Sequence, residues 1–177
     1  MAIREVLQVG NPLLRQKCSP VEDPSSSAAA EVLRDLADTL AHWRAETGYG
    51  RGIAAPQIGV LERLVFLKMD RPSLLINPAI TARSKETMTV WDTCLSFLCI
   101  FMQVRRYRRI TVRYQDLSGA WQEVRAEGDL SELLQHEIDH LDGILALDRT
   151  KDIKTICTRE EFERRYRQES PYAQIVA

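Results

Sequence analysis

One short segment, residues 133–143, carries two histidines and a glutamate in the order His136-Glu137-x-x-His140. On an α-helix, residues four apart lie one turn from each other on the same face, so both imidazoles can bind one divalent ion. Glu137 is adjacent to them and is placed to accept a proton from a water molecule that such an ion activates. These residue types at this spacing predict a helical metal site with hydrolytic chemistry.

The alternative is a surface helix whose histidines have no function, but the surrounding residues favour a buried helix. Asp129 and Glu132 form a capping-box-like start, and Gly143 fits the C′ position at the other end. A helix that is apolar around most of its girth is expected to be buried, where its histidines and glutamate need partners that a metal supplies. The apolar residues that recur at helical spacing are Leu130, Leu133, Leu134, Ile138 and Leu141.

The whole chain has the composition of an ordinary globular protein, with 177 residues, 45% hydrophobic and 28% charged, and a net charge of −1. This length predicts a single domain over residues 1–177, and the charge balance favours neither nucleic acid nor a membrane surface as a partner. The basic run at residues 105–109 is interpreted as a solvated strand end. No apolar run is long enough to cross a bilayer, and residues 1–8 lack the apolar core of a signal peptide. We therefore expect a cytoplasmic protein whose four cysteines are reduced.

Patterns along the rest of the chain predict helices and short strands, and therefore an α+β fold. Two further helices are expected at residues 29–45 and about 159–168. The two ends of the chain, residues 1–27 and 169–177, are expected to be irregular or frayed. Strands are predicted at residues 63–69, 73–77, 87–91, 110–114 and 121–126, with residues 70–72 and Pro78 ending the first two.

Two histidines do not complete a catalytic metal site, which normally has three protein ligands and an open position for water. Glu160 lies downstream of His136 and would be the third ligand in a thermolysin-like zinc peptidase. Cys94 follows a predicted strand, and a thiolate is a strong ligand for iron or zinc. A free cysteine is also commonly a small buried apolar residue, so spacing alone does not choose between the two candidates.

Three motifs in order give the chain a resemblance to the peptide deformylase family. They are Gly50-x-Gly52-Ile53-Ala54-Ala55-Pro56-Gln57-Ile58-Gly59, Cys94-Leu95-Ser96 and Gln135-His136-Glu137-x-Asp139-His140-Leu141-x-Gly143. The resemblance covers about residues 6–148 and stops before the helical extension at about residues 158–177. It implies an α+β fold in which antiparallel sheets wrap around the central motif helix. It also implies one divalent ion, natively Fe²⁺ with Zn²⁺, Ni²⁺ or Co²⁺ as substitutes, held by Cys94, His136 and His140.

The resemblance further implies a metal-dependent hydrolase that removes the formyl group from N-formylmethionyl peptides and releases formate. In the implied mechanism a metal-bound hydroxide attacks the formyl carbon, and Glu137 acts first as base and then as acid. The oxyanion would be bound by the side-chain amide of Gln57 and the backbone N–H of Leu95. From the residues alone a turn role is favoured for Gln57, and the resemblance explains a placed amide better. Asp139 is explained equally by helix packing and by solvent exposure. A zinc peptidase using Glu160 and a metal-stabilised relative without activity are the alternatives.

The chain departs from the family pattern in the expected substrate pocket. Thr93 stands where the family has glycine, and Phe101 where it often has arginine. Arg51 and Glu132 replace apolar residues, and they either pair with each other or recognise a polar N-formyl compound. The residues expected to contact substrate are Gly52, Ile53, Thr93, Arg51, Glu132 and Leu133. The sequence makes no prediction about ribosome contact or oligomeric state.

Overall fold

The computed structural model describes residues 2–69 and 73–169 of the chain. Its α-helices are α1 (Ser27–Thr47), α2 (Asp129–Leu141) and α3 (Arg159–Arg165). Its strands are β1 (Gly52–Ala54), β2 (Leu64–Leu67), β3 (Ser73–Arg83), β4 (Thr87–Asp92), β5 (Ile100–Tyr107), β6 (Arg109–Gln115), β7 (Trp121–Glu127) and β8 (Cys157–Thr158). Among the helices of these described residues, none is both long and apolar enough to cross a membrane.

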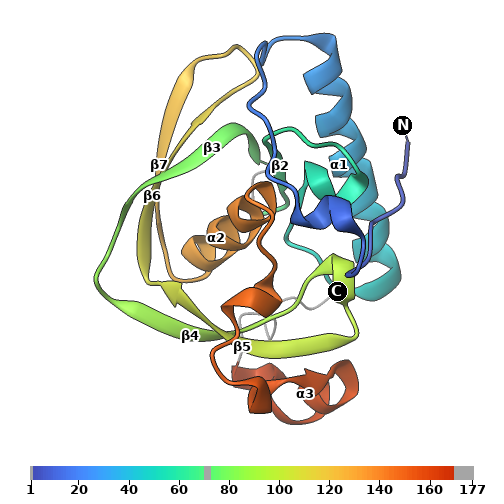
Figure 1. Cartoon of the computed structure of the whole chain (residues 1–177), viewed down its shortest axis with the longest axis vertical. Helices are drawn as coiled ribbons and strands as arrows, with labels where there is room; N and C mark the ends of the chain where they lie inside the picture. The colour runs from blue at the N-terminus through green and yellow to red at the C-terminus, as the bar shows by residue number, and fades with distance from the viewer. Residues whose placement is uncertain (1, 70–72, 170–177) are drawn as a thin grey trace.

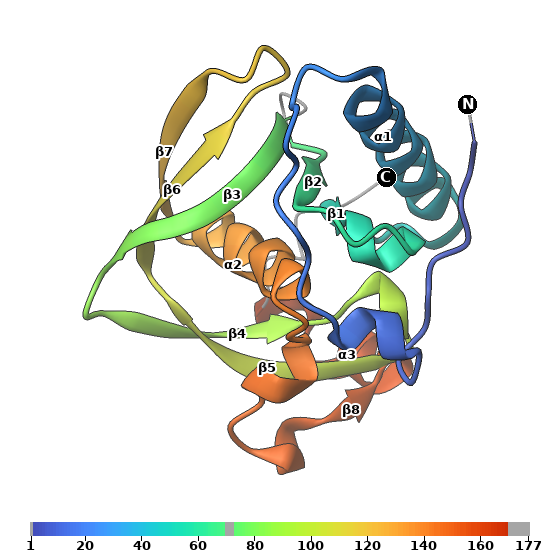
Figure 2. The same ribbon diagram turned by 45° about the horizontal axis from the view of Figure 1, so that its top comes forward.

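Two antiparallel sheets surround α2. Strands β1-β2-β3-β6-β7 form one sheet in that order, and β4-β5-β8 form the other. Figure 1 shows α2 in the space between the long curved strands of the two sheets, with α3 beside β5. In Figure 2, α1 lies on the outer side of β1 and β2, away from α2. The predicted α+β class with antiparallel sheets is therefore confirmed.

Helix α2 is buried along almost its whole length, because every residue from Ser131 to Leu141 is buried. Gln135 holds the polar side of the helix, where it accepts a hydrogen bond from the Tyr107 backbone N–H at 2.9 Å and donates one to the Tyr107 carbonyl at 2.9 Å. The position of the motif side chains is therefore fixed by packing on all sides of the helix. The apolar side packs on the five-stranded sheet through Leu133, Leu134, Ile138 and Leu141.

Helix α1 covers the opposite face of β1 and β2. The Ser26 hydroxyl accepts from the Ala29 backbone N–H at 3.2 Å, and Gly48 ends the helix with φ of 73°. The predicted helix is confirmed with somewhat longer bounds. Strand β1 is consequently held between two helices, which matters because its first residue, Gly52, lies against Glu137 of α2. The buried side chains of this layer include Leu33, Leu36, Leu40, Ile53, Leu64 and Phe66.

Strand β3 is longer than predicted, because it does not stop at Pro78. Its register against β6 shifts between Ile76 and Ala79, and Asn77 has φ of 52°. Proline is tolerated at such a bulge, since the residue there is outside the regular hydrogen-bond ladder. The Asn77 side chain holds the bulge by bonding both the N–H and the carbonyl of Val21, at 2.8 and 2.9 Å. The predicted turn at residues 70–72 lies outside the described residues.

The last helix, α3, packs on β5. It begins after Thr158, whose hydroxyl accepts from the Glu161 N–H at 3.4 Å, and it ends at Arg165, earlier than predicted. The ring of Phe162 stacks on Phe101 of β5, with centroids 4.0 Å apart and an angle of 9° between planes. Phe101 thus serves as a docking residue for the C-terminal helix. Residues 170–177, expected to be frayed, lie outside the described part of the chain.

The sequence predicted the end of α2 correctly but not the capping at its start. The helix begins after Gly128, and no side chain caps it, so the predicted capping box of Asp129 and Glu132 is wrong. Glu132 instead forms an ion pair with Arg51. At the other end Gly143 has φ of +73°, as a C′ residue should. A Cβ at Gly143 would lie 2.5 Å from the Arg15 carbonyl oxygen.

We expect Gly143→Ala to destabilise the protein more than Gly119→Ala does. Both glycines have positive φ, +73° and +80°. An alanine at either position must therefore adopt a left-handed backbone conformation, which destabilises the fold by about 1–2 kcal/mol. Gly119 has nothing within 4 Å of an added Cβ, whereas Gly143 faces backbone that must move. The extra loss should be about 1–3 kcal/mol, measured by urea unfolding. Equal losses in the two variants would contradict this close contact.

Candidate metal centre

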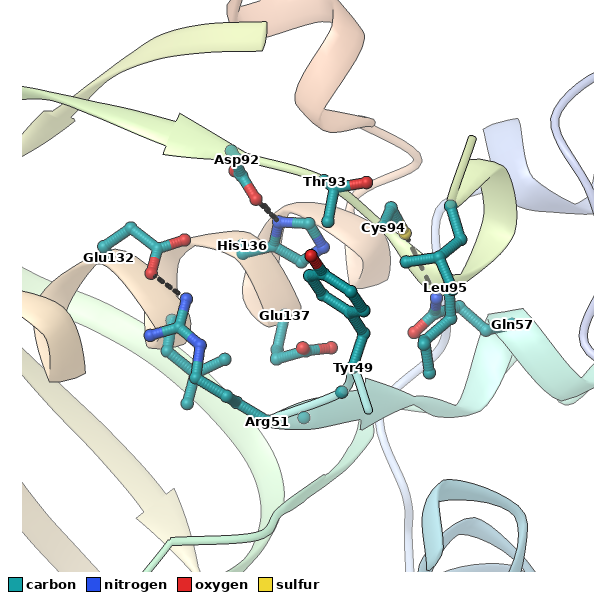
Figure 3. Close-up of a pocket in the computed structure, with 14 residues that line it drawn as sticks. Tyr49, Arg51, Gln57, Asp92, Thr93, Cys94, Leu95, Glu132, His136 and Glu137 are labelled. Carbon is teal, nitrogen blue, oxygen red and sulfur yellow. Dashed lines mark hydrogen bonds and ion pairs between the residues drawn. The ribbon is translucent and has the colours of Figure 1, made fainter. Parts of the chain in front are cut away.

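Cys94, His136 and His140 come together at the centre of the molecule. One ligand atom from each lies within 4.8 Å of the others, and all three side chains are buried. The sulfur of Cys94 is 3.1 Å from Nε2 of His140. Cys94 lies two residues after the end of β4, while both histidines come from α2. Figure 3 shows Cys94 and His136 on these segments. Glu160 is exposed on α3 and is not part of this group.

Asp92, the last residue of β4, orients the first histidine. Nδ1 of His136 lies 3.1 Å from Oδ2 of Asp92, and the Arg106 guanidinium donates to the same oxygen at 3.1 Å. Burial acts to raise the pKa of Asp92, but His136 and Arg106 outweigh it and hold that pKa well below its usual range. The ionised carboxylate can only accept, so Nδ1 of His136 donates to it. Nε2 is then the atom that would bind a metal. Burial acts to lower the pKa of His136, but Asp92 outweighs it and raises that pKa well above its usual value, so a metal would displace the proton from Nε2.

The donor set fits a divalent transition metal. A thiolate and two imidazoles suit iron or zinc, and three protein ligands leave a position open. Burial and the nearby His136 hold the pKa of His140 well below its usual value, which keeps that imidazole neutral. A neutral imidazole is the form that binds metal. The residues present therefore match a mononuclear metal site.

Glu137 lies beside this group, with its carboxylate against Gly52 of β1. Its side chain is buried, and its Oε2 has no hydrogen-bond partner among the described residues. Burial raises the pKa of Glu137 to about 7. A Cβ on Gly52 would lie 2.5 Å from Oε1 of Glu137, so only glycine allows this close approach. A buried carboxylate oxygen without a donor is available to take a proton from a bound reactant.

Gln57 acts both as a turn residue and as a placed amide. Its Oε1 accepts from the Ala54 N–H at 2.9 Å, which fixes the short 3₁₀ turn Ala55–Ile58. Its Nε2 is then directed at the centre, 3.3 Å from the sulfur of Cys94. Leu95 begins a second 3₁₀ turn, Leu95–Phe97, and the first N–H groups of a helical turn have no partner within it. Two donors are thus present beside the three clustered side chains.

A cavity adjoins the centre, and it contains most of the residues expected to contact substrate. Thr93 lines it, with its hydroxyl donating to the Ile100 carbonyl at 2.7 Å. Ile53 does not line it and packs in the core beneath α1. The lining residues are Tyr49, Gly50, Arg51, Gly52, Gln57, Asp92, Thr93, Cys94, Leu95, Leu98, Glu132, Leu133, His136 and Glu137.

A buried charge network behind the centre was missed by the sequence analysis. Arg106 is only 2% exposed and lies between Asp92 and Asp139, so the interpretation of the run 105–109 as solvated is wrong for this residue. Asp139 is buried and pairs also with Arg149, which excludes the solvent-exposed role. The available signal was weak. It consisted of Asp92, two residues before Cys94, and of Arg106 on β5, the strand that follows.

The chain is similar to known proteins over most of its length. The family model for polypeptide deformylase matches residues 3–155. The peptide deformylase of Dictyoglomus thermophilum is 38% identical over 90% of this chain and 99% of its own, and that of Thermotoga neapolitana 36% over 86% and 90%. The crystal structure of the Thermotoga maritima peptide deformylase has a TM-score of 0.80 at 32% identity, covering 86% of this chain and all of that one. A Met-Ala-Ser-bound class I type b enzyme of Acinetobacter baumannii has a TM-score of 0.77 at 26% identity, covering 84% and 98%.

Sheets wrapped around a helix, with a thiol and two imidazoles converging beside a buried glutamate, define a metallohydrolase. The family match covers more than half of the chain, and the relatives exceed 30% identity over most of it. The chain belongs to the polypeptide deformylase family, whose enzymes depend on a metal.

Proposed function

We propose that this protein is a metal-dependent hydrolase that removes the formyl group from the amino end of N-formyl peptides and releases formate. The family's substrates are nascent N-formylmethionyl peptides. The observation that carries the proposal is the convergence of a buried base, Glu137, and an amide donor, Gln57, on the cavity beside Cys94. We propose the cytosol as its compartment, because Cys94 must be a reduced thiol there to act as a ligand.

We propose Cys94, His136 and His140 as the metal ligands and Fe²⁺ as the native ion, with Zn²⁺, Ni²⁺ or Co²⁺ as substitutes. Thiolate and imidazole donors suit all of these ions, and the open position is where a water molecule would bind. An ion held by these residues would supply a lowered pKa for that water, toward neutrality. Asp92 supports the set by keeping the His136 ring in one orientation.

The protein residues do the remaining steps. Glu137 accepts a proton from the water molecule while the oxygen of that water bonds to the formyl carbon. Gly52, which has no side chain, allows the Glu137 carboxylate to lie this close. Nε2 of Gln57 and the backbone N–H of Leu95 donate to the oxygen on which negative charge develops. Glu137 then gives its proton to the nitrogen as the carbon–nitrogen bond breaks. The products are formate and a free amine.

Formate release tests the proposal directly. We expect the enzyme loaded with Fe²⁺ under anaerobic conditions to release formate from N-formyl peptides, with kcat/KM in the range of ordinary enzymes, about 10⁴ M⁻¹s⁻¹ or more. Removing the metal with a chelator should abolish the release, and adding Fe²⁺ back should restore it. A fully loaded enzyme that releases no formate from any N-formyl peptide would refute the proposed function.

The ligand set can be tested separately by metal content. We expect Cys94→Ala to lose most of its bound metal after dialysis, because one of three ligands is gone. Glu160→Ala should bind as much metal as the unaltered protein, since Glu160 is exposed on α3. Metal analysis by mass spectrometry gives both values. The reverse result, with metal lost only from Glu160→Ala, would favour the zinc-peptidase alternative.

A further inference from the structure

One end of the cavity is polar where an aliphatic wall would be expected. Arg51 and Glu132 form an ion pair there, and their side chains are 14% and 1% exposed. Glu132 lies on α2 one turn before His136, and Arg51 directly precedes β1. Figure 3 shows this pair on one side of Glu137, with Gln57 and Leu95 on the other. The pair therefore belongs to the wall of the same cavity as Cys94 and His136.

The carboxylate of Glu132 is only half satisfied. Oε2 is bound by Arg51, whereas Oε1 is buried and has no hydrogen-bond partner among the described residues. In Figure 3 the second oxygen is turned toward His136, on the inner side of the pair. A buried carboxylate oxygen without a donor is unfavourable, and a ligand that brings a donor relieves that cost. The unpartnered oxygen therefore points to a ligand with an N–H or O–H group.

The first side chain of an N-formyl peptide is the group that reaches this end. In such a peptide the formyl carbon and the first Cα are two bonds apart, about 2.5 Å. With the formyl carbon between Cys94 and Glu137, and its oxygen at Gln57 and Leu95, the leaving nitrogen points away from those two donors. The side chain on the first Cα then enters the cavity toward Arg51 and Glu132. The hydrogen-bonding groups of this side chain must therefore match those of Arg51 and Glu132.

Cavity size also restricts the first side chain. The cavity has a volume of about 30 Å³, which is room for about two water molecules. A long thioether has no donor for Glu132, and it fits only if the ion pair moves. A short side chain with a hydroxyl or an amide fits more easily and supplies the missing donor.

We propose that Arg51 and Glu132 are specificity-determining residues, and that they select N-formyl peptides whose first side chain is short and donates a hydrogen bond, such as serine, threonine or asparagine. This inference rests on the proposed deformylase function and names the preferred substrate class of the same site. The donor bonds Oε1 of Glu132, and an acceptor on the same side chain faces Arg51. Leu133 and Tyr49 supply the remaining apolar wall.

The test compares substrates of equal shape. Formyl-Thr-Ala-Ser is paired with formyl-Val-Ala-Ser, and formyl-Asn-Ala-Ser with formyl-Leu-Ala-Ser, with formyl-Met-Ala-Ser as reference. We expect the Fe²⁺-loaded enzyme to show kcat/KM at least tenfold higher for the polar member of each pair. A double variant, Arg51→Val with Glu132→Ile, removes both charges together, so that neither is left buried alone. In it the polar preference should disappear and the value for the methionyl peptide should rise at least tenfold.

Each outcome has a separate meaning. Formate from every peptide, with polar and apolar members of a pair within twofold of each other, overturns the inference and leaves the proposed function standing. No formate from any peptide overturns the proposed function itself. The comparison in the unaltered enzyme needs no variant, so it decides the matter even if the double variant does not fold. Glu160→Gln, a change to an exposed glutamate, is the control for the effect of substitution alone.

Discussion

Replacing Glu137 by glutamine is expected to lower kcat for formate release by about 10²–10⁴-fold while metal content stays unchanged. Glutamine has nearly the shape of glutamate, so it fits against the backbone of Gly52 where a larger side chain does not. It cannot accept a proton from water or return one to the leaving nitrogen. The loss therefore measures proton transfer separately from metal binding and from folding.

The measurement is steady-state formate release with metal content determined on the same sample. Glu160→Gln makes the same chemical change on the exposed surface of α3 and should leave kcat within about twofold, since an exposed substitution has little effect. Loss in kcat rather than in KM is expected, because the interaction is made in the transition state. A Glu137→Gln enzyme with full metal and nearly full kcat would show that another group handles the proton.

The helix that carries the histidines was predictable from the sequence because its signals are local. Spacing within the segment places His136 and His140 on one face, and the apolar repeat around them indicates burial. The contact of Cys94 with these histidines is not local, because it depends on how β4 returns to α2. Only the family resemblance chose Cys94 over Glu160 in the sequence. The structure places its sulfur beside His140.

Features that depend on partners from distant elements were not predictable. In the run at residues 105–109, Arg106 is buried and its neighbours Arg105 and Arg108 are exposed. Alternation along β5 points Arg106 inward, but that strand was not recognised, because arginines at its end resemble a solvated surface. The two aspartates that neutralise Arg106 come from β4 and α2. A single-sequence pattern contains no record of such pairing.

Two departures from the family pattern acquire a physical reason in the fold. Phe101 stands at a position that the resemblance gives as often arginine, and here it stacks on Phe162 of helix α3. Glu132 replaces an apolar residue, and here it pairs with Arg51, which itself replaces an aliphatic residue. Each change is thus accompanied by a partner elsewhere in the chain. The two pairings account for a docked helix α3 and for a charged pair in the cavity wall.

The largest expected effect on stability comes from Arg106→Met. Methionine keeps much of the volume but removes the charge between Asp92 and Asp139, both of which are buried. Asp139 retains its ion pair with Arg149, whereas His136 is the partner that Asp92 keeps among the described residues. Removing one partner of a buried ion pair lowers the free energy of unfolding by about 3–5 kcal/mol. For a chain of this size that corresponds to a fall in Tm of roughly 6 to 20 °C.

Arg108→Met is the matched control for that change, because it removes an arginine from the same basic run. Arg108 is exposed, and its ion-pair partners among the described residues are the exposed Glu86 and Glu127, so its loss should cost less than about 1 kcal/mol. Thermal unfolding of both variants gives the comparison. Arg106→Met should also weaken metal binding by about 10–100-fold in competition with a chelator, because Asp92 no longer holds His136 as firmly. Similar Tm values and metal affinities in the two variants would mean that the buried network does not support the centre.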